Sequence, residues 1–387
     1  MNILFVSSTY YPHINGVYYF VCRIGPMLQE RGHKVAVIAP SETARFSLKK
    51  IDNLDVYGMP SVSVIINPSI HIPIPFFLKS RIKRIIENFK PDIIHIQDHF
   101  PLSKAVVNVN KNMKIPIIGS NHFMPENLTA LLQNENLKKR AENYLWKGFS
   151  KVFNQVNLVT TPTETGAKLI RPRLKVKVMT ISSGISLTDF NPFGDTREIK
   201  ERYSLPDKPI LLYVGRLDPE KHIEEILKAV AIAVKKIDFC FVVVGKGTSK
   251  IPLEKLSNQL GIKDKVIFTG FVPDECLPYF YKLSRCFIMA SIAELLSLGT
   301  LQAMASGLPV ISVKAGALVE LVKDRMNGYL YEEGDIPAIV QYIEDILIHD
   351  DVYTKMSQKS LEYVQQHDIK KTLESFEKAY QDQAGKS

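Results

Sequence analysis

Cysteine is scarce in this 387-residue chain, and its four cysteines lack the C-x-x-C spacing typical of zinc or redox sites. They are scattered along the sequence as Cys22, Cys240, Cys276 and Cys286. We therefore expect reduced thiols, a cytoplasmic protein and no zinc site. No apolar run reaches the roughly 18 residues that a membrane-spanning helix needs. The first residues lack a basic segment followed by a cleavage site, so no signal peptide is expected.

Acidic residues are fewer than basic ones: the chain has 40 aspartates and glutamates and 49 lysines and arginines, and its net charge is +9. Such a balance suits nucleic acid, an anionic membrane or a phosphorylated ligand as partner. The sequence has no RNP-like segment, zinc-finger spacing or basic arm, which disfavours nucleic acid. The dinucleotide fingerprint G-x-G-x-x-G with a following ribose acid is also missing, so NAD binding is not expected.

The positive charge is concentrated in residues 79–90, where five cations occur in twelve residues. Apolar residues recur there at helical spacing: Ile82, Ile85, Ile86 and Phe89. Two interpretations remain open, an ordinary sheet-covering helix with a solvated face and a helix that docks on an anionic membrane. In the second case the cations that contact the membrane or the acceptor are Lys79, Arg81, Lys83 and Arg84.

Apolar strand-like runs alternate with helical stretches, which predicts an α/β protein with doubly wound parallel sheets. The first half has such runs at Ile3–Ser7, Val35–Ala39, Asp92–Ile96, Ile115–Ser120 and Leu158–Thr161. The second half has them at Ile210–Val214, Phe239–Val244, Val266–Thr269, Arg285–Met289 and Val310–Val313. The part that follows Ala39 is less regular and contains Pro60, Pro68, Pro73 and Pro75, and turn residues around 186–208 indicate a linker. The predicted domains are 1–195 and 196–367, followed by a helix at 368–387.

The most informative stretch runs from Ser291 to Leu330, in the order acid, loop, helix, strand, glycine turn, helix, strand. A loop that leads into a helix N-terminus presents free N–H groups and suits a phosphate. Glu294 precedes that helix, where a carboxylate is poorly placed to hold phosphate but well placed to accept hydrogen bonds from hydroxyls. Together these features indicate a sugar nucleotide.

This stretch resembles the donor signature of family 4 glycosyltransferases, which reads S-x-x-E-x7-E-A-M-A-x-G-x-P-V and continues to E-x-V-x-x-x-x-N-G. The matching residues are Ser291, Glu294, Ala303, Met304, Ala305, Gly307, Pro309, Val310, Glu320, Asn327 and Gly328. The chain departs from the signature at Gln302, where the family has a second acid. Leu295-Leu296-Ser297 replaces the usual glycines.

The resemblance implies the GT-B fold, two Rossmann-like domains facing an interdomain cleft, with the last helix crossing back to the first domain. It also implies a retaining hexosyltransferase that needs no metal. Glu294 and His122 are its expected catalytic residues. The expected donor-binding residues are Gly16, Arg216, Lys221, Gly245, Leu298 and Gln302. Arg216 and Lys221 would clamp the diphosphate, and His222 stands where the family usually has glycine.

The expected function is transfer of a hexose from a nucleotide diphosphate sugar, with a UDP-sugar favoured, to a hydroxyl of a membrane lipid. The family includes diacylglycerol and phosphatidylinositol glycosyltransferases, so the protein is expected to be peripheral on the inner face of the membrane. No cofactor is expected, because the sugar nucleotide is a substrate. A soluble or polysaccharide-precursor acceptor, a weakly active homologue that binds sugar nucleotide, and a GT-B epimerase remain alternatives. His95 and His99 are weaker site candidates.

Overall fold

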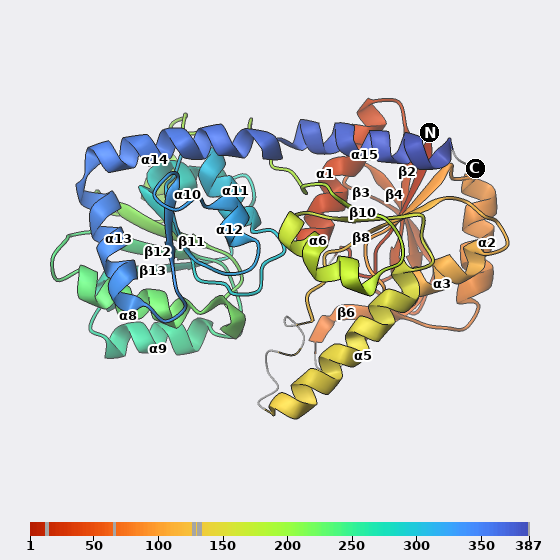
Figure 1. Cartoon of the computed structure of the whole chain (residues 1–387), viewed down its shortest axis with the longest axis horizontal. Helices are drawn as coiled ribbons and strands as arrows, with labels where there is room; N and C mark the ends of the chain where they lie inside the picture. Colours follow the sequence, from red (N-terminus) through yellow and green to blue (C-terminus); the bar gives the residue numbers. More distant parts are fainter. Residues whose placement is uncertain (12–14, 65–66, 126–128, 130–133, 386–387) are drawn as a thin grey trace. The chain divides into compact units, whose positions relative to one another are not determined.

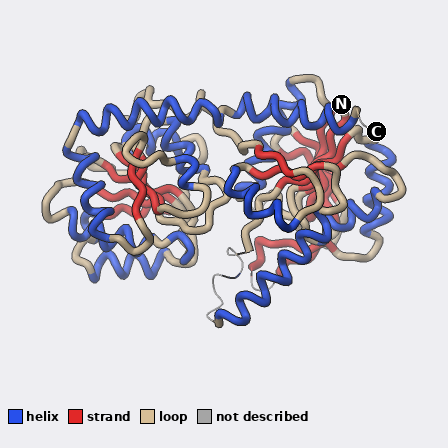
Figure 2. Tube along the Cα trace, in the orientation of Figure 1, coloured by secondary structure: helices blue, strands red, loops and turns tan. Residues whose placement is uncertain are grey.

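The computed structural model describes residues 1–11, 15–64, 67–125, 129 and 134–385. The chain forms two compact units, which Figure 1 and Figure 2 show as sheets covered by helices. Unit 1 contains Met1–Ser183 and Lys370–Ser387, and unit 2 contains Gly184–Ile369. The division falls before the predicted boundary at 195. Residues just after Ser183 belong to unit 2 because Ile185 forms a parallel bridge with Asp368 and Phe190 enters the unit 2 core.

Unit 1 is built on an eight-stranded sheet in the order β10-β9-β8-β7-β1-β2-β4-β3. Its strands are β1 (Asn2–Val6), β2 (Lys34–Pro40), β3 (Ser47–Ile51), β4 (Leu54–Met59), β7 (Ile93–Ile96), β8 (Ile117–Ser120), β9 (Leu158–Thr161) and β10 (Val178–Thr180). Neighbouring strands are parallel except β3, which is antiparallel to β4. Strands β1, β7, β8 and β9 are almost entirely buried, as their apolar runs predicted, whereas β10 at one edge of the sheet is only partly buried.

The irregular part expected after β2 is more ordered than the sequence indicated. It contains β3 and β4, and then an antiparallel hairpin of β5 (Ser61–Val64) and β6 (Asn67–Pro73). Strand β3 is mostly exposed and carries Lys49 and Lys50, so it lacks the apolar signature of a central strand. Pro60 and Pro73 lie at strand ends, where the missing N–H costs little. Strand β3 lies at the edge of the large sheet, and β5 and β6 form a separate two-stranded sheet, so these three strands lack the long apolar runs by which a central strand is predicted.

The helices of unit 1 are α1 (Gly16–Glu30), α2 (Leu78–Phe89), α3 (Pro101–Asn110), α5 (Glu135–Phe153), α6 (Glu164–Ile170), the 3₁₀ turn η1 (Arg171–Arg173) and α15 (Ile369–Ala384). Asn15 caps α1 by accepting hydrogen bonds from the N–H groups of Val17 and Tyr18. From Lys370 onward, α15 packs within unit 1. There Glu377 lies 3.0 Å from the ring of His33, and the Tyr380 hydroxyl lies 2.8 Å from His95 Nδ1.

The helix predicted in the basic segment is α2, and its apolar face is directed as expected. Its buried residues include Ile82, Ile85, Ile86 and Phe89, which join the core of unit 1. The opposite face is exposed to solvent and carries Lys79, Arg81, Lys83 and Arg84. The aliphatic side of α2 is therefore committed to the protein core, and only its charged side is open to a partner.

Unit 2 has a six-stranded parallel sheet in the order β13-β12-β11-β14-β15-β16. Its strands are β11 (Ile210–Val214), β12 (Cys240–Val244), β13 (Val266–Gly270), β14 (Cys286–Met289), β15 (Val310–Val313) and β16 (Gly328–Tyr331). The five strands predicted in this half all exist, each within one residue of its expected ends. These strands could be predicted closely because a continuous apolar run is a clear sequence signal of a buried parallel strand.

The helices of unit 2 are α7 (Arg197–Arg202), α8 (Ile223–Ala233), α9 (Lys250–Gln259), α10 (Leu277–Leu283), α11 (Leu298–Ala305), α12 (Leu318–Leu321), α13 (Ile336–Ile348) and α14 (Asp350–Tyr363). Unit 2 also has three 3₁₀ turns: η2 (Pro219–Lys221), η3 (Lys263–Lys265) and η4 (Val364–His367), which follows α14. Within the described ranges, no helix is both long and apolar enough to cross a membrane.

Candidate functional site

Loops that follow the carboxyl ends of strands in unit 2 are joined by backbone hydrogen bonds into one polar edge. The Leu217 N–H donates to the Lys246 carbonyl at 2.9 Å, which links the loops after β11 and β12. The Ala317 N–H donates to the Glu294 carbonyl at 3.0 Å, which links the loops after β14 and β15. Ligands of open α/β sheets bind at this edge.

The charged centre of this edge is an ion pair between Lys221 and Glu294. Lys221 Nζ lies 2.7 Å from Glu294 Oε1 and 3.3 Å from Ser291 Oγ. The Lys221 and Glu294 side chains are only 11% and 15% exposed. Gly316, at φ +52°, allows the close approach of the Glu294 backbone, since a Cβ there would lie 2.9 Å from the Glu294 carbonyl oxygen. The fold thus holds an ammonium and a carboxylate together in a partly desolvated place.

Arg216, the other member of the predicted diphosphate clamp, has a different environment. Its side chain is 59% exposed and pairs with Asp218 and with Glu220, the latter at 2.7 Å. A diphosphate that binds Arg216 must therefore share or displace these carboxylates. Asp218 is also held by Thr248, whose N–H and hydroxyl each donate to Oδ1 at 3.0 Å. Arg216 is a solvated cation that can reorient, whereas Lys221 is held in place.

Gly245 adopts a backbone conformation that only glycine tolerates well, with φ at +144°. A Cβ at this position would lie 1.9 Å from the Gly215 carbonyl oxygen. We expect Gly245→Ala to destabilise unit 2 by about 3 kcal/mol or more, since a backbone clash adds to the usual strain of about 1–3 kcal/mol. The shift in the urea unfolding midpoint measures this loss.

Gly261 provides the matched control for that substitution. It also has positive φ, at +71°, but nothing lies within 4 Å of the position that a Cβ would occupy. Gly261→Ala should therefore lower the free energy of unfolding only by the strain of the left-handed conformation, about 1 kcal/mol, and shift the urea midpoint less. Equal losses for the two variants would show that the contact between the loops after β11 and β12 does not restrict Gly245.

Gln302, which replaces the second acid of the resembled signature, is tied into the core of unit 2. It lies on α11, is 6% exposed, and its Oε1 accepts a hydrogen bond from the buried hydroxyl of Tyr281 at 2.8 Å. Leu298 is the first residue of α11 and is half-buried. Ser297 caps that helix by accepting a hydrogen bond from the Thr300 N–H. The neutral amide therefore has a structural partner that the sequence did not reveal.

We expect Gln302→Glu to lower stability and to change donor affinity only modestly. A carboxylate here is nearly buried, and although Tyr281 still donates to it, its desolvation is not offset by a cation in the same contact. Thermal unfolding together with donor titration measures the two effects separately. A variant with full stability and no donor binding would contradict the expectation.

In unit 1, His122 lies directly after β8, and its Nε2 is 3.0 Å from the Gln97 amide oxygen. Burial lowers the pKa of His122 to about 4, so the ring is neutral at pH 7. The contact with a carbonyl oxygen assigns the proton to Nε2 and leaves Nδ1 as an acceptor. Neighbouring His95 is fully buried and bridges the Tyr380 and Ser120 hydroxyls. A neutral His122 can therefore bind a hydroxyl but carries no charge.

Several buried polar atoms close to His122 in the sheet have no hydrogen-bond partner among the described residues. Gln97 Nε2, Asn121 Nδ2 and Thr161 Oγ1 come from the ends of β7, β8 and β9, which are successive neighbours in the sheet. Buried polar groups normally have partners, so such a group of unsatisfied atoms indicates a place for a polar ligand. Sequence reasoning missed Gln97 and Thr161, although their position at strand ends was a usable signal.

Protonation of buried histidines should make the protein less stable in acid. Burial lowers the pKa of His99, His122 and His367 to about 4, whereas the unfolded chain titrates near 6.5. Between pH 6.5 and 4 the unfolded state binds more protons, so stability falls as the pH falls, by about 1 kcal/mol per pH unit for each histidine. Unfolding midpoints at several pH values measure the slope. If the His122→Gln variant showed the same dependence of stability on pH as wild type, protonation of His122 would not contribute to the acid sensitivity.

Comparison with solved structures shows the architecture to which these two units belong. Sucrose-phosphate synthase from Thermosynechococcus elongatus matches at TM-score 0.81 and 18% identity, over 100% of both chains. Anabaena HepE, solved with UDP-glucose, matches at TM-score 0.77 and 14% identity, over 98% of this chain and 99% of that one. The two α/β units thus have the GT-B fold.

Sequence comparison then gives the family. Residues 14–189 match the family described as Glycosyltransferase Family 4, and residues 195–363 match Glycosyl transferases group 1. The chain belongs to glycosyltransferase family 4 and is a glycosyltransferase. It is 28% identical to an alpha-monoglucosyldiacylglycerol synthase from Streptococcus pneumoniae, over 86% of this chain and 75% of the relative. It is 24% identical to a GDP-mannose-dependent alpha-mannosyltransferase from Mycolicibacterium smegmatis, over 89% and 88%.

Proposed function

We propose that this glycosyltransferase moves a hexose, with retention of configuration, from a nucleotide diphosphate sugar to a hydroxyl of a membrane lipid. The contact between Lys221 and Glu294, at the carboxyl edge of the unit 2 sheet, is the observation that supports binding of the sugar nucleotide there. A relative whose name states a glucosyldiacylglycerol product supports the lipid acceptor. A UDP-sugar is the favoured donor, in line with the UDP-glucose complex of HepE.

In the proposed reaction, the acceptor hydroxyl oxygen bonds to the anomeric carbon on the face from which the diphosphate leaves. The bond between that carbon and the phosphate oxygen breaks, and the leaving oxygen takes the acceptor proton. No protein base and no metal are assigned to this step. Lys221 stabilises the charge that develops on the leaving group, and Glu294 accepts hydrogen bonds from sugar hydroxyls. The neutral His122 is proposed to bind a hydroxyl of the transferred hexose.

The surface of unit 1 near the start of α2 supports a membrane-bound acceptor. Phe76 and Phe77, just before this helix, are 74% and 66% exposed, and large exposed aromatic pairs are uncommon without a binding role. The exposed cations of α2 follow directly: Lys79, Arg81, Lys83 and Arg84. Aromatic rings beside cations suit the interface of an anionic bilayer. We propose that α2 places the enzyme peripherally on the cytoplasmic face of a membrane.

A second candidate is mannosyl transfer from GDP-mannose, favoured by the mycobacterial relative. A third is a weakly active homologue that binds sugar nucleotide, favoured by Gln302 in place of the second acid. The choice between them depends on which donor is turned over, and on whether a lipid acceptor raises the rate.

Release of nucleotide diphosphate from UDP-, GDP- and ADP-sugars, with and without anionic liposomes that contain diacylglycerol, tests these candidates. The proposal predicts release from a UDP-sugar that rises with liposomes, and a glycolipid product with the anomeric configuration of the donor. Release from GDP-mannose alone would favour the second candidate. Donor binding without any release would favour the third. Release that lipid does not change would point to a soluble acceptor.

A further inference from the structure

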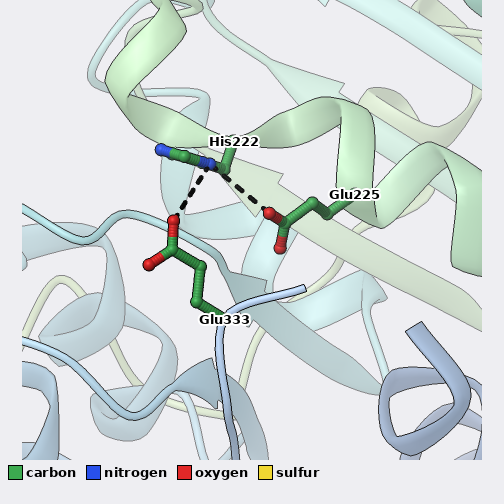
Figure 3. A group of neighbouring side chains, drawn as sticks. All are labelled: His222, Glu225 and Glu333. Carbon is green, nitrogen blue, oxygen red and sulfur yellow. Dashed lines mark ion pairs between the residues drawn. The ribbon is translucent and has the colours of Figure 1, made fainter. Parts of the chain in front are cut away.

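Three side chains with metal-ligating atoms lie close together in unit 2 (Figure 3). One of them, His222, directly follows Lys221 in the chain. His222 lies between η2 and α8, Glu225 is in the first turn of α8, and Glu333 is in the turn after β16. One ligand atom from each lies within 4.8 Å of the other two. Figure 3 shows both carboxylates directed at the same nitrogen of the imidazole.

The spacing of these atoms is wider than hydrogen bonding requires. His222 Nδ1 lies 3.4 Å from Glu225 Oε1 and 4.0 Å from Glu333 Oε1. Hydrogen bonds from nitrogen to oxygen are normally about 2.7–3.2 Å long. In a tetrahedral zinc site with bonds of about 2.0–2.1 Å, two ligand atoms lie about 3.3 Å apart. A small movement of the exposed Glu333 side chain thus completes the spacing that a bound cation requires.

A buried hydroxyl next to the cluster also lacks a partner. Tyr331, the last residue of β16, is 2% exposed, and its hydroxyl has no hydrogen-bond partner among the described residues. Tyr331 stands two residues before Glu333, at the end of the strand that leads into the turn holding that carboxylate. Hydrogen bonds from such outer groups orient metal-ligating carboxylates. The Gly334 N–H also faces Glu225 Oε2, at a long 3.4 Å.

The charge of the cluster suits a divalent cation. Two carboxylates offset the positive end of the α8 helix, which would otherwise repel a metal ion. The ligands are one imidazole nitrogen and carboxylate oxygens, a set that binds zinc-class ions well, whereas calcium and magnesium prefer oxygen alone. Partial exposure of His222 at 23% and Glu333 at 56% leaves an entry path and room for water as a further ligand.

We propose that His222, Glu225 and Glu333 form a binding site for a divalent transition cation of the zinc class. The cation joins the start of α8 to the turn after β16, two segments that are more than 100 residues apart in the chain. It takes no part in the proposed sugar transfer, and the proposal does not depend on that function.

The test is titration of the full chain with Zn²⁺ after chelator treatment, followed by calorimetry and by thermal unfolding. Co²⁺ serves as a second probe, because its absorption reports a site with nitrogen and oxygen ligands. Wild type should bind one equivalent and unfold at a higher temperature when Zn²⁺ is present. His222→Gln and Glu333→Gln should each weaken binding by at least about tenfold, since loss even of outer partners costs that much. Glu333 is exposed, so its variant should keep the fold.

His349→Gln is the matched control, because His349 Nε2 also lies 4.0 Å from a carboxylate, that of Asp345, but pairs with that one acid in the contacts described. This variant should bind Zn²⁺ as wild type does. Three results would overturn the proposal: no binding to wild type, equal binding by the His222 and His349 variants, or Mg²⁺ binding as tight as Zn²⁺ binding. In each case the cluster is an ion pair between a histidine and two glutamates.

Discussion

Lys221→Met is expected to lower sugar-nucleotide turnover by about 10²–10³-fold, the usual cost of removing one group that stabilises developing charge. Lys221 Nζ is held by Glu294 and Ser291 and is largely desolvated, so its charge acts with little screening by water. Most of the loss should appear in kcat, because the diphosphate gains charge as it leaves. Steady-state kinetics with the donor identified by the release assay measure the change.

The same substitution leaves Glu294 without its partner, and breaking a largely buried pair destabilises a protein. The double variant Lys221→Met with Glu294→Gln separates the two effects, because it removes both charges. Stability should recover in it, while activity stays low. Lys314→Met is the control, since Lys314 pairs with Glu332 at 2.8 Å but on the exposed surface, and it should change neither property by much. Activity that recovers with stability would show that Lys221 serves only the fold.

Neutralising the four cations of α2 is expected to weaken binding to anionic vesicles by up to about a thousandfold at low salt. Each cation near such a surface contributes about 1 kcal/mol, and four together give about 4 kcal/mol. The aliphatic face of α2 is buried in the core of unit 1 and cannot insert into lipid. Only Phe76 and Phe77 are therefore expected to make apolar contact with lipid, and the charges of α2 should contribute most of the membrane affinity. Co-sedimentation compares wild type with the variant in which Lys79, Arg81, Lys83 and Arg84 are changed to Gln.

A second quadruple variant controls for net charge. Its four lysines lie exposed on unit 2 and are also changed to Gln: Lys228, Lys235, Lys255 and Lys263. Both variants lose four charges, so only a local role of α2 predicts a difference between them. Raised salt should weaken wild-type binding because it screens exposed charges. Equal binding by the two variants would assign α2 the ordinary role of a solvated, sheet-covering helix.

The sequence alone determined the α/β class, the strands of unit 2 and the amphipathic face of α2. These features depend on local periodicity, because buried parallel strands are continuous apolar runs and a helix buries every third or fourth residue. The stretch from Ser291 to Gly328 likewise identified the family, since its loop, helix and turn are contiguous in the chain. The sequence did not predict the edge strand β3 or the hairpin of β5 and β6, because such strands lack a continuous apolar run.

Only the tertiary structure decided which distant side chains meet. Lys221 and Glu294 are 73 residues apart, Gln302 and Tyr281 are 21 apart, and His122 and Gln97 are 25 apart. Each pair meets because parallel strands bring their carboxyl ends to one edge of a sheet, or because a helix packs on its neighbour. The sequence could not predict that Gln302 meets Tyr281 or that His222 lies near Glu333. Such contacts depend on strand order and packing, and the periodicity of apolar residues contains information on neither.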